Sequence, residues 1–132
     1  MKKQYEELMS AAKSAAKNAY APYSRFQVGS AVLTKAGKIF IGANVENASF
    51  SLTNCAERAA LQNAVSNGAK NITAIAVWTK SGGVFPCGAC RQVILELAPN
   101  ADILINNKTG DSKIFKPSKL LASGFSKEDL KK

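Results

Sequence analysis

From residue 55 onward, amphipathic segments of about a dozen residues alternate with apolar, strand-like runs. Residues 71–79 (NITAIAVWT) are a nearly continuous apolar run, and residues 102–106 (DILIN) are another. Between them, residues 87–97 (CGACRQVILEL) have helical spacing and end shortly before Pro99. Two strands joined through a helix run parallel in one sheet, because the helix carries the chain back to the same end of the sheet. This alternation predicts an α/β fold.

The first third of the chain adds a helix and a hairpin. Apolar side chains recur at helical spacing near the N-terminus and stop before Pro22, and two strand-like runs then flank Lys35-Ala36-Gly37. We therefore expect a three-layer α/β/α sandwich with a mixed central sheet, in which the first two strands pair antiparallel. The expected elements are helices over about 3–19, 55–67 and 87–97, and strands over 26–34, 38–44, 71–79, 102–106 and 112–115, with residues 45–54 irregular.

The length and composition suit one globular domain that spans residues 1–132. A chain of 132 residues, of which 46% are hydrophobic and 20% charged, can bury one core without disulfide staples. No apolar run reaches the roughly 18 residues of a membrane span. The N-terminal MKKQYEELMSAAKSAAK also places charges where a signal peptide is apolar. We expect a cytoplasmic protein with no membrane partner.

The net charge of +9 raises the question of a nucleic-acid partner. Of the 18 basic residues only Arg25, Arg58 and Arg91 carry the guanidinium fork that binds phosphate through two parallel hydrogen bonds. The lysines are spread along the whole chain, from Lys2 to Lys132. This pattern favours a generally basic surface, so no nucleic-acid partner is expected.

Three cysteines and no histidine give the strongest chemical signal in the sequence. Cys55 and Cys87 each stand at the start of a predicted helix, and Cys90 follows one turn after Cys87. A helix N-terminus carries unpaired N–H groups and a partial positive charge, which lower the pKa of a thiol. Three thiolates that face one another suit zinc, and three protein ligands with an open fourth position are typical of a catalytic zinc site.

Two charged residues follow Cys55 in the same predicted helix. Glu57 lies in the first turn, where it can reach toward a metal-bound water and act as a general base. Arg58 comes three residues after Cys55 and therefore lies on the same helix face. Three thiolates on Zn²⁺ leave an excess negative charge, which Arg58 and the two helix N-termini would offset.

Each cysteine motif taken alone has a plainer interpretation. A single Cys55 is most often a buried packing residue, and Cys87-Gly88-Ala89-Cys90 has the spacing of a redox dithiol. The redox interpretation leaves Cys55 and Glu57 without a role. Cys-Ala-Glu at one helix start and Pro-Cys-x-x-Cys at another form a far more specific pair, which matches the signature of zinc nucleobase deaminases.

With these motifs, the sequence resembles the small, homotetrameric cytidine deaminases. The resemblance rests on NVENAS at 44–49, NCAER at 54–58 and PCGACRQ at 86–92, and it extends over most of the chain. It implies hydrolysis of cytidine or deoxycytidine to uridine or deoxyuridine, with release of ammonia and one zinc ion per subunit. It also suggests a role in pyrimidine salvage.

The resemblance further implies the catalytic roles of individual residues. Cys55, Cys87 and Cys90 would hold the zinc ion, and the zinc-bound hydroxide would attack C4 of the base. Glu57 would be the proton shuttle, which protonates N3 of the base and then passes a proton to the departing amine.

Four residues match the substrate contacts of the family. Asn44 and Glu46 match its ribose contacts, and residues two apart on an extended segment share one side, although both are also common turn residues. Phe26 matches an aromatic ring that packs against the base, whereas a Phe at a strand start, taken alone, is more often a core residue. The main chain of Ala56 would help hold the pyrimidine edge.

Two departures from the family bear on the subunit contacts. Phe50 stands where the family usually has Tyr, and Ala122 stands where a proline commonly follows Leu-Leu. In the family, a phenylalanine like Phe125 reaches into the site of a neighbouring subunit. The resemblance therefore implies a homotetramer with shared sites.

Three other functions stay open on the sequence. One is deamination of another aminated nucleoside or of a polynucleotide, although polynucleotide deaminases usually place His at the position of Cys55. Another is thiol redox chemistry at Cys87 and Cys90. The third is a zinc-stabilised binding module without catalysis, in which Glu57 would have no essential role.

Overall fold

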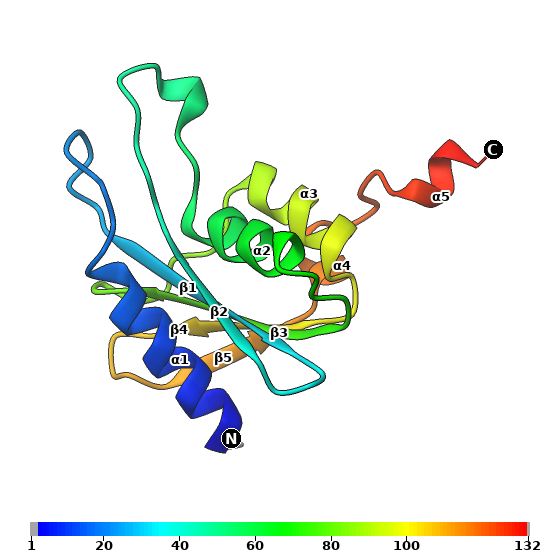
Figure 1. The fold of residues 1–132 in the computed structure, drawn as a ribbon, viewed down its shortest axis with the longest axis horizontal. Coiled ribbons are helices and arrows are strands. Elements are labelled where there is room, and N and C mark those ends of the chain that lie inside the picture. Colours follow the sequence, from blue (N-terminus) through cyan, green and yellow to red (C-terminus); the bar gives the residue numbers. More distant parts are fainter. Residues whose placement is uncertain (1–2, 132) are drawn as a thin grey trace.

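A five-stranded mixed sheet forms the centre of the computed structural model, which describes residues 3–131 (Figure 1). The strands lie in the order β2-β1-β3-β4-β5. Their bounds are β1 Val28–Thr34, β2 Ile39–Ala43, β3 Ile72–Thr79, β4 Asp102–Asn106 and β5 Ser112–Phe115. The helices are α1 Lys3–Ala16, α2 Ala56–Ser66, α3 Gly88–Leu97, α4 Pro117–Leu120 and α5 Lys127–Leu130, with a 3₁₀ turn at Phe50–Leu52. Within residues 3–131, no helix is both long and apolar enough to cross a bilayer.

The connections between strands combine a hairpin with two helical crossovers. β1 and β2 form the expected antiparallel hairpin, with Ala31 opposite Ile41. β3 and β4 pair parallel and are joined through α3. The other crossover, α2, joins β2 to β3, and β1 lies between these two strands and pairs antiparallel with both. The predicted mixed sheet is confirmed, whereas the place of β1 between β2 and β3 was not part of the prediction.

Helices cover both faces of the sheet, with α1 on one face and α2 and α3 on the other (Figure 1). Alternate residues of β3 pack on opposite faces of the sheet. Ile75 and Val77 lie in the hydrophobic cluster under α2 and α3, and Ala74 and Ala76 lie in the cluster under α1. A strand buried on both faces needs apolar residues at nearly every position. The predicted α/β/α sandwich is confirmed.

Two glycines allow helices to approach the sheet closely. A Cβ atom at Gly29 of β1 would lie 1.8 Å from the carbonyl oxygen of Ala12 in α1. At Gly42 of β2, a Cβ atom would lie 2.3 Å from the backbone nitrogen of Ala60 in α2. Backbone atoms cannot approach a side-chain carbon this closely, so only glycine fits at either position.

The boundaries of two N-terminal elements differ from the expected ones. α1 ends at Ala16 rather than near residue 19, because residues 17–19 continue as a turn. β1 begins at Val28 rather than at residue 26, because the side-chain amide of Asn44 bonds the backbone of Phe26 and Val28 at the start of the strand. The residues just before β1 are thereby left beside the sheet, not in it.

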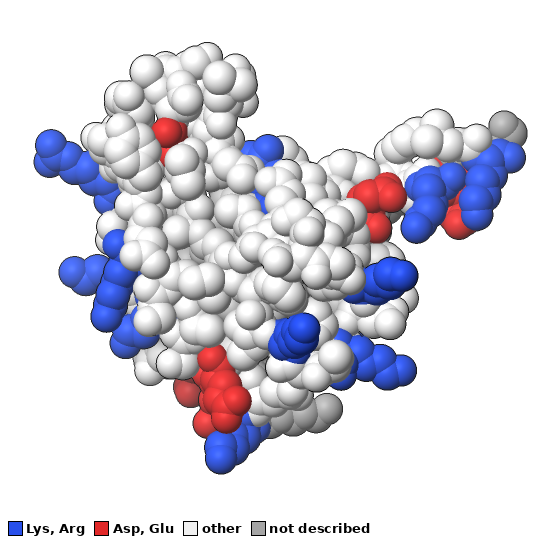
Figure 2. Space-filling view, viewed as in Figure 1, with Lys and Arg blue, Asp and Glu red and all other residues white. Residues whose placement is uncertain are grey.

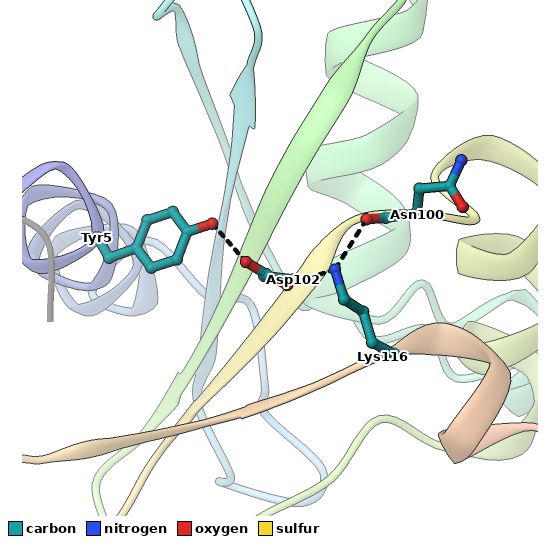
Figure 3. A network of polar contacts seen from close by, with 4 residues as sticks. All are labelled: Tyr5, Asn100, Asp102 and Lys116. Carbon is teal, nitrogen blue, oxygen red and sulfur yellow. Dashed lines mark hydrogen bonds and ion pairs between the residues drawn. The ribbon is translucent and has the colours of Figure 1, made fainter.

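A polar network ties α1 to β4 and to the start of α4 (Figure 3). The Tyr5 hydroxyl donates a hydrogen bond of 2.6 Å to Asp102 Oδ2, and Lys116 Nζ lies 2.6 Å from Asp102 Oδ1. Lys116 Nζ also donates to the carbonyl oxygen of Asn100 at 3.2 Å. Burial and the Asp102 carboxylate raise the pKa of Tyr5 to about 12.

Tyr5→Phe is expected to lower the free energy of unfolding at pH 7 by about 1.5–3 kcal/mol, because it removes a hydrogen bond to a charged group. The folded-state pKa of Tyr5 lies above its ordinary value of about 10. The contribution of this hydrogen bond is therefore complete below pH 10 and is lost as the pH rises toward 12. Urea unfolding of both proteins should show a difference in stability at pH 7 that narrows across this interval. Tyr20→Phe is the matched control, because Tyr20 is 56% exposed; equal midpoints for Tyr5→Phe and the wild type at pH 7 would refute the prediction.

Candidate active site

Two helix N-termini bring the three cysteines together on one face of the sheet. Cys55 is the N-cap residue of α2, Cys87 is the N-cap residue of α3, and Cys90 lies in the first turn of α3. In both helices the cap side chain makes no hydrogen bond to the helix, so it is not used to close the helix end. The thiols therefore face the partial positive charge of two helix ends, as expected from the sequence.

The geometry of the three sulfur atoms fits zinc. All three Sγ atoms lie within 4.8 Å of one another, and the distance from Cys55 Sγ to Cys87 Sγ is 3.8 Å. Sulfur atoms bonded to a tetrahedral zinc ion at about 2.3 Å are separated by about 3.8 Å. The three cysteines are free thiols, with Cys90 buried and Cys87 exposed. These donors suit a zinc ion that stays accessible from one side.

Electrostatic interactions within the cluster stabilise a thiolate at Cys55. Hydrogen bonding from Cys90, together with Arg58 and Cys87, lowers the pKa of Cys55 to about 5 despite its partial burial. The Cys55 thiolate in turn raises the pKa of Cys90. Arg58 Nη2 lies 3.4 Å from Cys55 Sγ and 3.4 Å from the carbonyl oxygen of Thr53. The guanidinium group therefore lies where it can offset negative charge on the sulfur atoms.

Glu57 lies in the first turn of α2 and is only 4% exposed. Burial raises the pKa of its carboxyl group to about 7, and the negative charge of Cys55 adds to this effect. A carboxyl group with a pKa near neutrality can both accept and return a proton at physiological pH. Glu57 is therefore suited to proton transfer beside the cysteines.

A cavity of about 260 Å³ opens beside the cluster. Its walls combine Cys55, Cys87 and Glu57 with apolar side chains from β1, β3 and the loop before α3. Small-molecule sites usually enclose about 300–1,000 Å³. At about 260 Å³, this cavity lies just below that range. The lining residues are Ser24, Phe26, Val28, Asn44, Glu46, Thr53, Cys55, Ala56, Glu57, Val77, Val84, Phe85 and Cys87.

Asn44 and Glu46 both line the cavity, and both also hold the loop before β1. Asn44 Oδ1 accepts a hydrogen bond of 2.9 Å from the Val28 amide, and Asn44 Nδ2 donates one of 2.8 Å to the Phe26 carbonyl. Glu46 accepts hydrogen bonds from the backbone amides of Tyr23 and Ser24 and from the Ser24 hydroxyl. The Ser24 hydroxyl and the two amides lower the pKa of Glu46, so it is ionised at neutral pH. Asn44 retains one acceptor position on Oδ1 and one donor position on Nδ2, and the Glu46 carboxylate retains one acceptor position on Oε2.

The structure brings Phe26 and Ala56 to the cavity, but not Phe125. Phe26 is 41% exposed and lines the cavity, so the interpretation of this residue as core is wrong. Ala56 is the first residue of α2, and it lies beside Cys55. Phe125 is 57% exposed on the C-terminal segment, which projects away from the sheet (Figure 1). Gln92 Nε2 donates a hydrogen bond of 2.8 Å to its carbonyl oxygen, which attaches this segment to α3.

Sequence reasoning assigned no role to six of the residues that line the cavity, among them Phe85 and Ser24. Phe85 lines the cavity, and its ring makes a T-shaped contact with the ring of Phe115. The two ring centroids lie 4.9 Å apart. Its position directly before Pro86-Cys87 was the available signal. Ser24 was assigned no role from the sequence, and its hydroxyl donates a hydrogen bond to the carboxylate of Glu46.

Three thiols at converging helix ends, a buried carboxyl group with a pKa near 7 and a cavity beside them define a zinc-dependent hydrolytic enzyme. The sequence matches the model of the cytidine and deoxycytidylate deaminase zinc-binding region over residues 2–105. The chain belongs to this family of zinc enzymes.

Individual relatives resemble the chain over nearly their whole length. A cytidine deaminase of Sporosarcina psychrophila is 46% identical over 127 residues, which cover 95% of this chain and 93% of the relative. A cytidine deaminase of Halalkalibacterium halodurans is 49% identical over 125 residues, which cover 93% of this chain and 95% of the relative. The crystal structure of cytidine deaminase from Burkholderia pseudomallei is 46% identical and superposes with a TM-score of 0.88, covering 95% of this chain and 100% of that one.

Proposed function

We propose that this enzyme hydrolyses cytidine and deoxycytidine to uridine and deoxyuridine, with release of ammonia. The observation that carries the proposal is the buried Glu57 carboxyl group in the same cavity as the three-thiol cluster. Relatives named cytidine deaminase that cover 93–95% of this chain at 46–49% identity support the choice of substrate. The match also supports one catalytic domain over residues 1–132.

In this mechanism Cys55, Cys87 and Cys90 hold the zinc ion. When bound, zinc supplies a Lewis acid that lowers the pKa of water at its open position. Glu57 takes a proton from the attacking water and delivers it to N3 of the base as C4 becomes tetrahedral. Glu57 then takes the second proton of that water from the new C4 hydroxyl and passes it to the amino group, which leaves as ammonia while the C4 carbonyl forms. The balance is cytidine plus water to uridine plus ammonia.

The other cavity residues bind and orient the nucleoside. The free position on the Glu46 carboxylate accepts a hydrogen bond from a ribose hydroxyl, and Asn44 contacts the same sugar. The Phe26 ring packs against the base, and the main chain of Ala56 contacts the pyrimidine edge. Arg58 is a positioning residue, because its guanidinium group stabilises the thiolate of Cys55.

A time course of cytidine conversion by the zinc-loaded protein tests the proposal. The expected result is stoichiometric uridine and ammonia. Activity on a cytosine-containing oligonucleotide above that on cytidine would identify a polynucleotide deaminase instead. Reduction of insulin disulfides without cytidine turnover would identify a redox protein. If the folded, zinc-loaded protein is inactive on every aminated nucleoside, the remaining interpretation is a zinc-stabilised binding module without catalysis.

We also propose that the active enzyme is a homotetramer in which Phe125 completes the site of a neighbouring subunit. Support comes from the small cavity of one subunit and from the exposure of Phe125 on a projecting segment. The three free thiols suit a reducing compartment, so we place the enzyme in the cytoplasm, in pyrimidine salvage.

Light scattering after size-exclusion chromatography should give a mass of four times 14.0 kDa, about 56 kDa. Phe125→Ala is expected to lower kcat/KM about tenfold, because it removes an aromatic ring from the site of the neighbouring subunit. Leu130→Ala is the control, since Leu130 is exposed on the same C-terminal segment. A fully active monomer would contradict the shared site.

A further inference from the structure

A groove separate from the candidate active site lies on the α1 side of the sheet. This groove, which we call the basic groove, has a volume of about 440 Å³. Its walls come from the C-terminal half of α1, from the loop before β1 and from the end of β3. The charged and aromatic residues among those that line it are Lys13, Lys17, Arg25, Phe26, Trp78 and Lys80.

Four cations line the basic groove without acidic partners. Within residues 3–131, ion pairs join only Lys116 to Asp102 and Lys131 to Glu128, so none of the groove cations is neutralised by a carboxylate. Figure 2 shows Lys and Arg side chains along the left edge of the molecule, beside the C-terminal end of α1 in Figure 1. Like charges gathered around a hollow create a positive potential that attracts an anion. Several cations in one groove point to a ligand with more than one negative charge.

Two aromatic rings share this groove with the cations. Trp78 packs partly against the core cluster under α1, and Phe26 is 41% exposed. Lys13 Nζ lies 5.9 Å from the centre of the Trp78 ring. Aromatic faces bordered by cations favour a ligand that joins a flat ring to phosphate groups. The groove volume falls within the 300–1,000 Å³ usual for small-molecule sites.

The backbone of Arg25, in the loop before β1, has an unusual conformation. Arg25 has a φ of 57°, a left-handed conformation that residues other than glycine rarely adopt. Its amide donates a hydrogen bond of 2.9 Å to the carbonyl oxygen of Ala21, which closes a turn. Strained residues of this kind are concentrated at binding sites. The turn carries the guanidinium group to the groove formed by α1 and β3.

We propose that the basic groove binds a nucleoside polyphosphate, with the base against the aromatic rings and the phosphates against the four cations. Trp78 lines this groove and does not line the candidate active site, whereas Phe26 lines both. A nucleotide bound in the basic groove would therefore contact the Phe26 ring, which also borders the candidate active site. The proposal concerns binding alone and does not depend on deamination.

Trp78 is the only tryptophan of the chain, so its fluorescence reports on a ligand that binds against its ring. UTP titrated into the zinc-loaded protein, with excitation at 295 nm and correction for absorbance, should quench the emission and saturate. Uridine should give no quenching, and inorganic tripolyphosphate should compete at least tenfold more weakly than UTP, because it lacks the ring. The same titration of a thermally unfolded sample gives the baseline for collisional quenching.

Lys17→Glu/Lys80→Glu should weaken UTP binding at least tenfold, because two phosphate contacts become repulsive. The control Lys119→Glu/Lys127→Glu makes the same change of four charge units, from +9 to +5, at exposed positions of α4 and α5. It should bind UTP as the wild type does. Circular dichroism and the thermal midpoint establish that both variants are folded.

Four results would overturn the proposal. The first is absence of saturable quenching up to 1 mM UTP in 100 mM salt. The second is equal weakening in both double variants, which would show a general effect of surface charge. The third is tripolyphosphate that competes as well as UTP, which would show that the base contributes nothing. The fourth is a uridine decanucleotide that binds more tightly than UTP, which would identify a polynucleotide surface.

Discussion

Glu57→Ala is expected to lower kcat for cytidine by about 10²–10⁴-fold, the usual contribution of a positioned acid–base group. The carboxyl group is buried beside three thiols, and its pKa of about 7 lets it accept and donate protons at neutral pH. Among the described residues that line the cavity, the only other carboxyl group is that of Glu46, which accepts hydrogen bonds from the loop at Tyr23 and Ser24. The chemical step should therefore be lost while substrate binding is largely kept.

Three measurements separate loss of chemistry from loss of structure in this variant. Zinc content, thermal midpoint and KM should stay close to those of the wild type. Glu57→Gln, which keeps the shape of the side chain, should lose as much activity as Glu57→Ala. Glu96→Ala removes an exposed carboxyl group from α3 and should be fully active. A Glu57→Gln variant with wild-type kcat would remove Glu57 from the mechanism.

Cys87→Ala is expected to abolish stoichiometric zinc binding and turnover together. Cys87 is one of only three thiols around the site, and its removal leaves two protein ligands. Because Cys87 is exposed, its truncation removes little packing, so any loss of stability reports the lost metal. Elemental analysis of the purified variant measures zinc directly.

Removal of zinc from the wild type by a chelator gives the matched comparison. The metal-free wild type should unfold at the same temperature as Cys87→Ala, and added zinc should restore only the wild type. Cys90→Ser should also lose zinc, but with a larger loss of stability, because Cys90 is fully buried. A Cys87→Ala variant with one zinc per subunit would show that Cys87 is not a ligand.

Local patterns in the sequence were sufficient to predict most elements and the chemistry of the cluster. The apolar run at 71–79 predicts a strand covered on both faces, and β3 is that strand. The positions of Cys55 and Cys87 before two amphipathic segments predict N-cap thiols, which the structure contains. Such signals are visible because helix starts and strand periodicity depend on residues close together in the chain.

Other features depend on contacts between distant residues and could not be predicted. The insertion of β1 between β2 and β3 is set by which strands pair, and no local pattern encodes that choice. The exposure of Phe26 follows from the hydrogen bonds that Asn44, 18 residues later, makes to the loop before β1.

The sequence by itself therefore determined the α/β class, the three-thiol cluster and the candidate proton shuttle, because these depend on residue type and short spacing. The tertiary structure decided the buried setting that raises the pKa of Glu57, since burial depends on how α2 packs against the sheet. It also decided that Lys13, Arg25 and Lys80 share one groove. These cations are far apart along the chain, and only the packing of α1 against β1 and β3 brings them together.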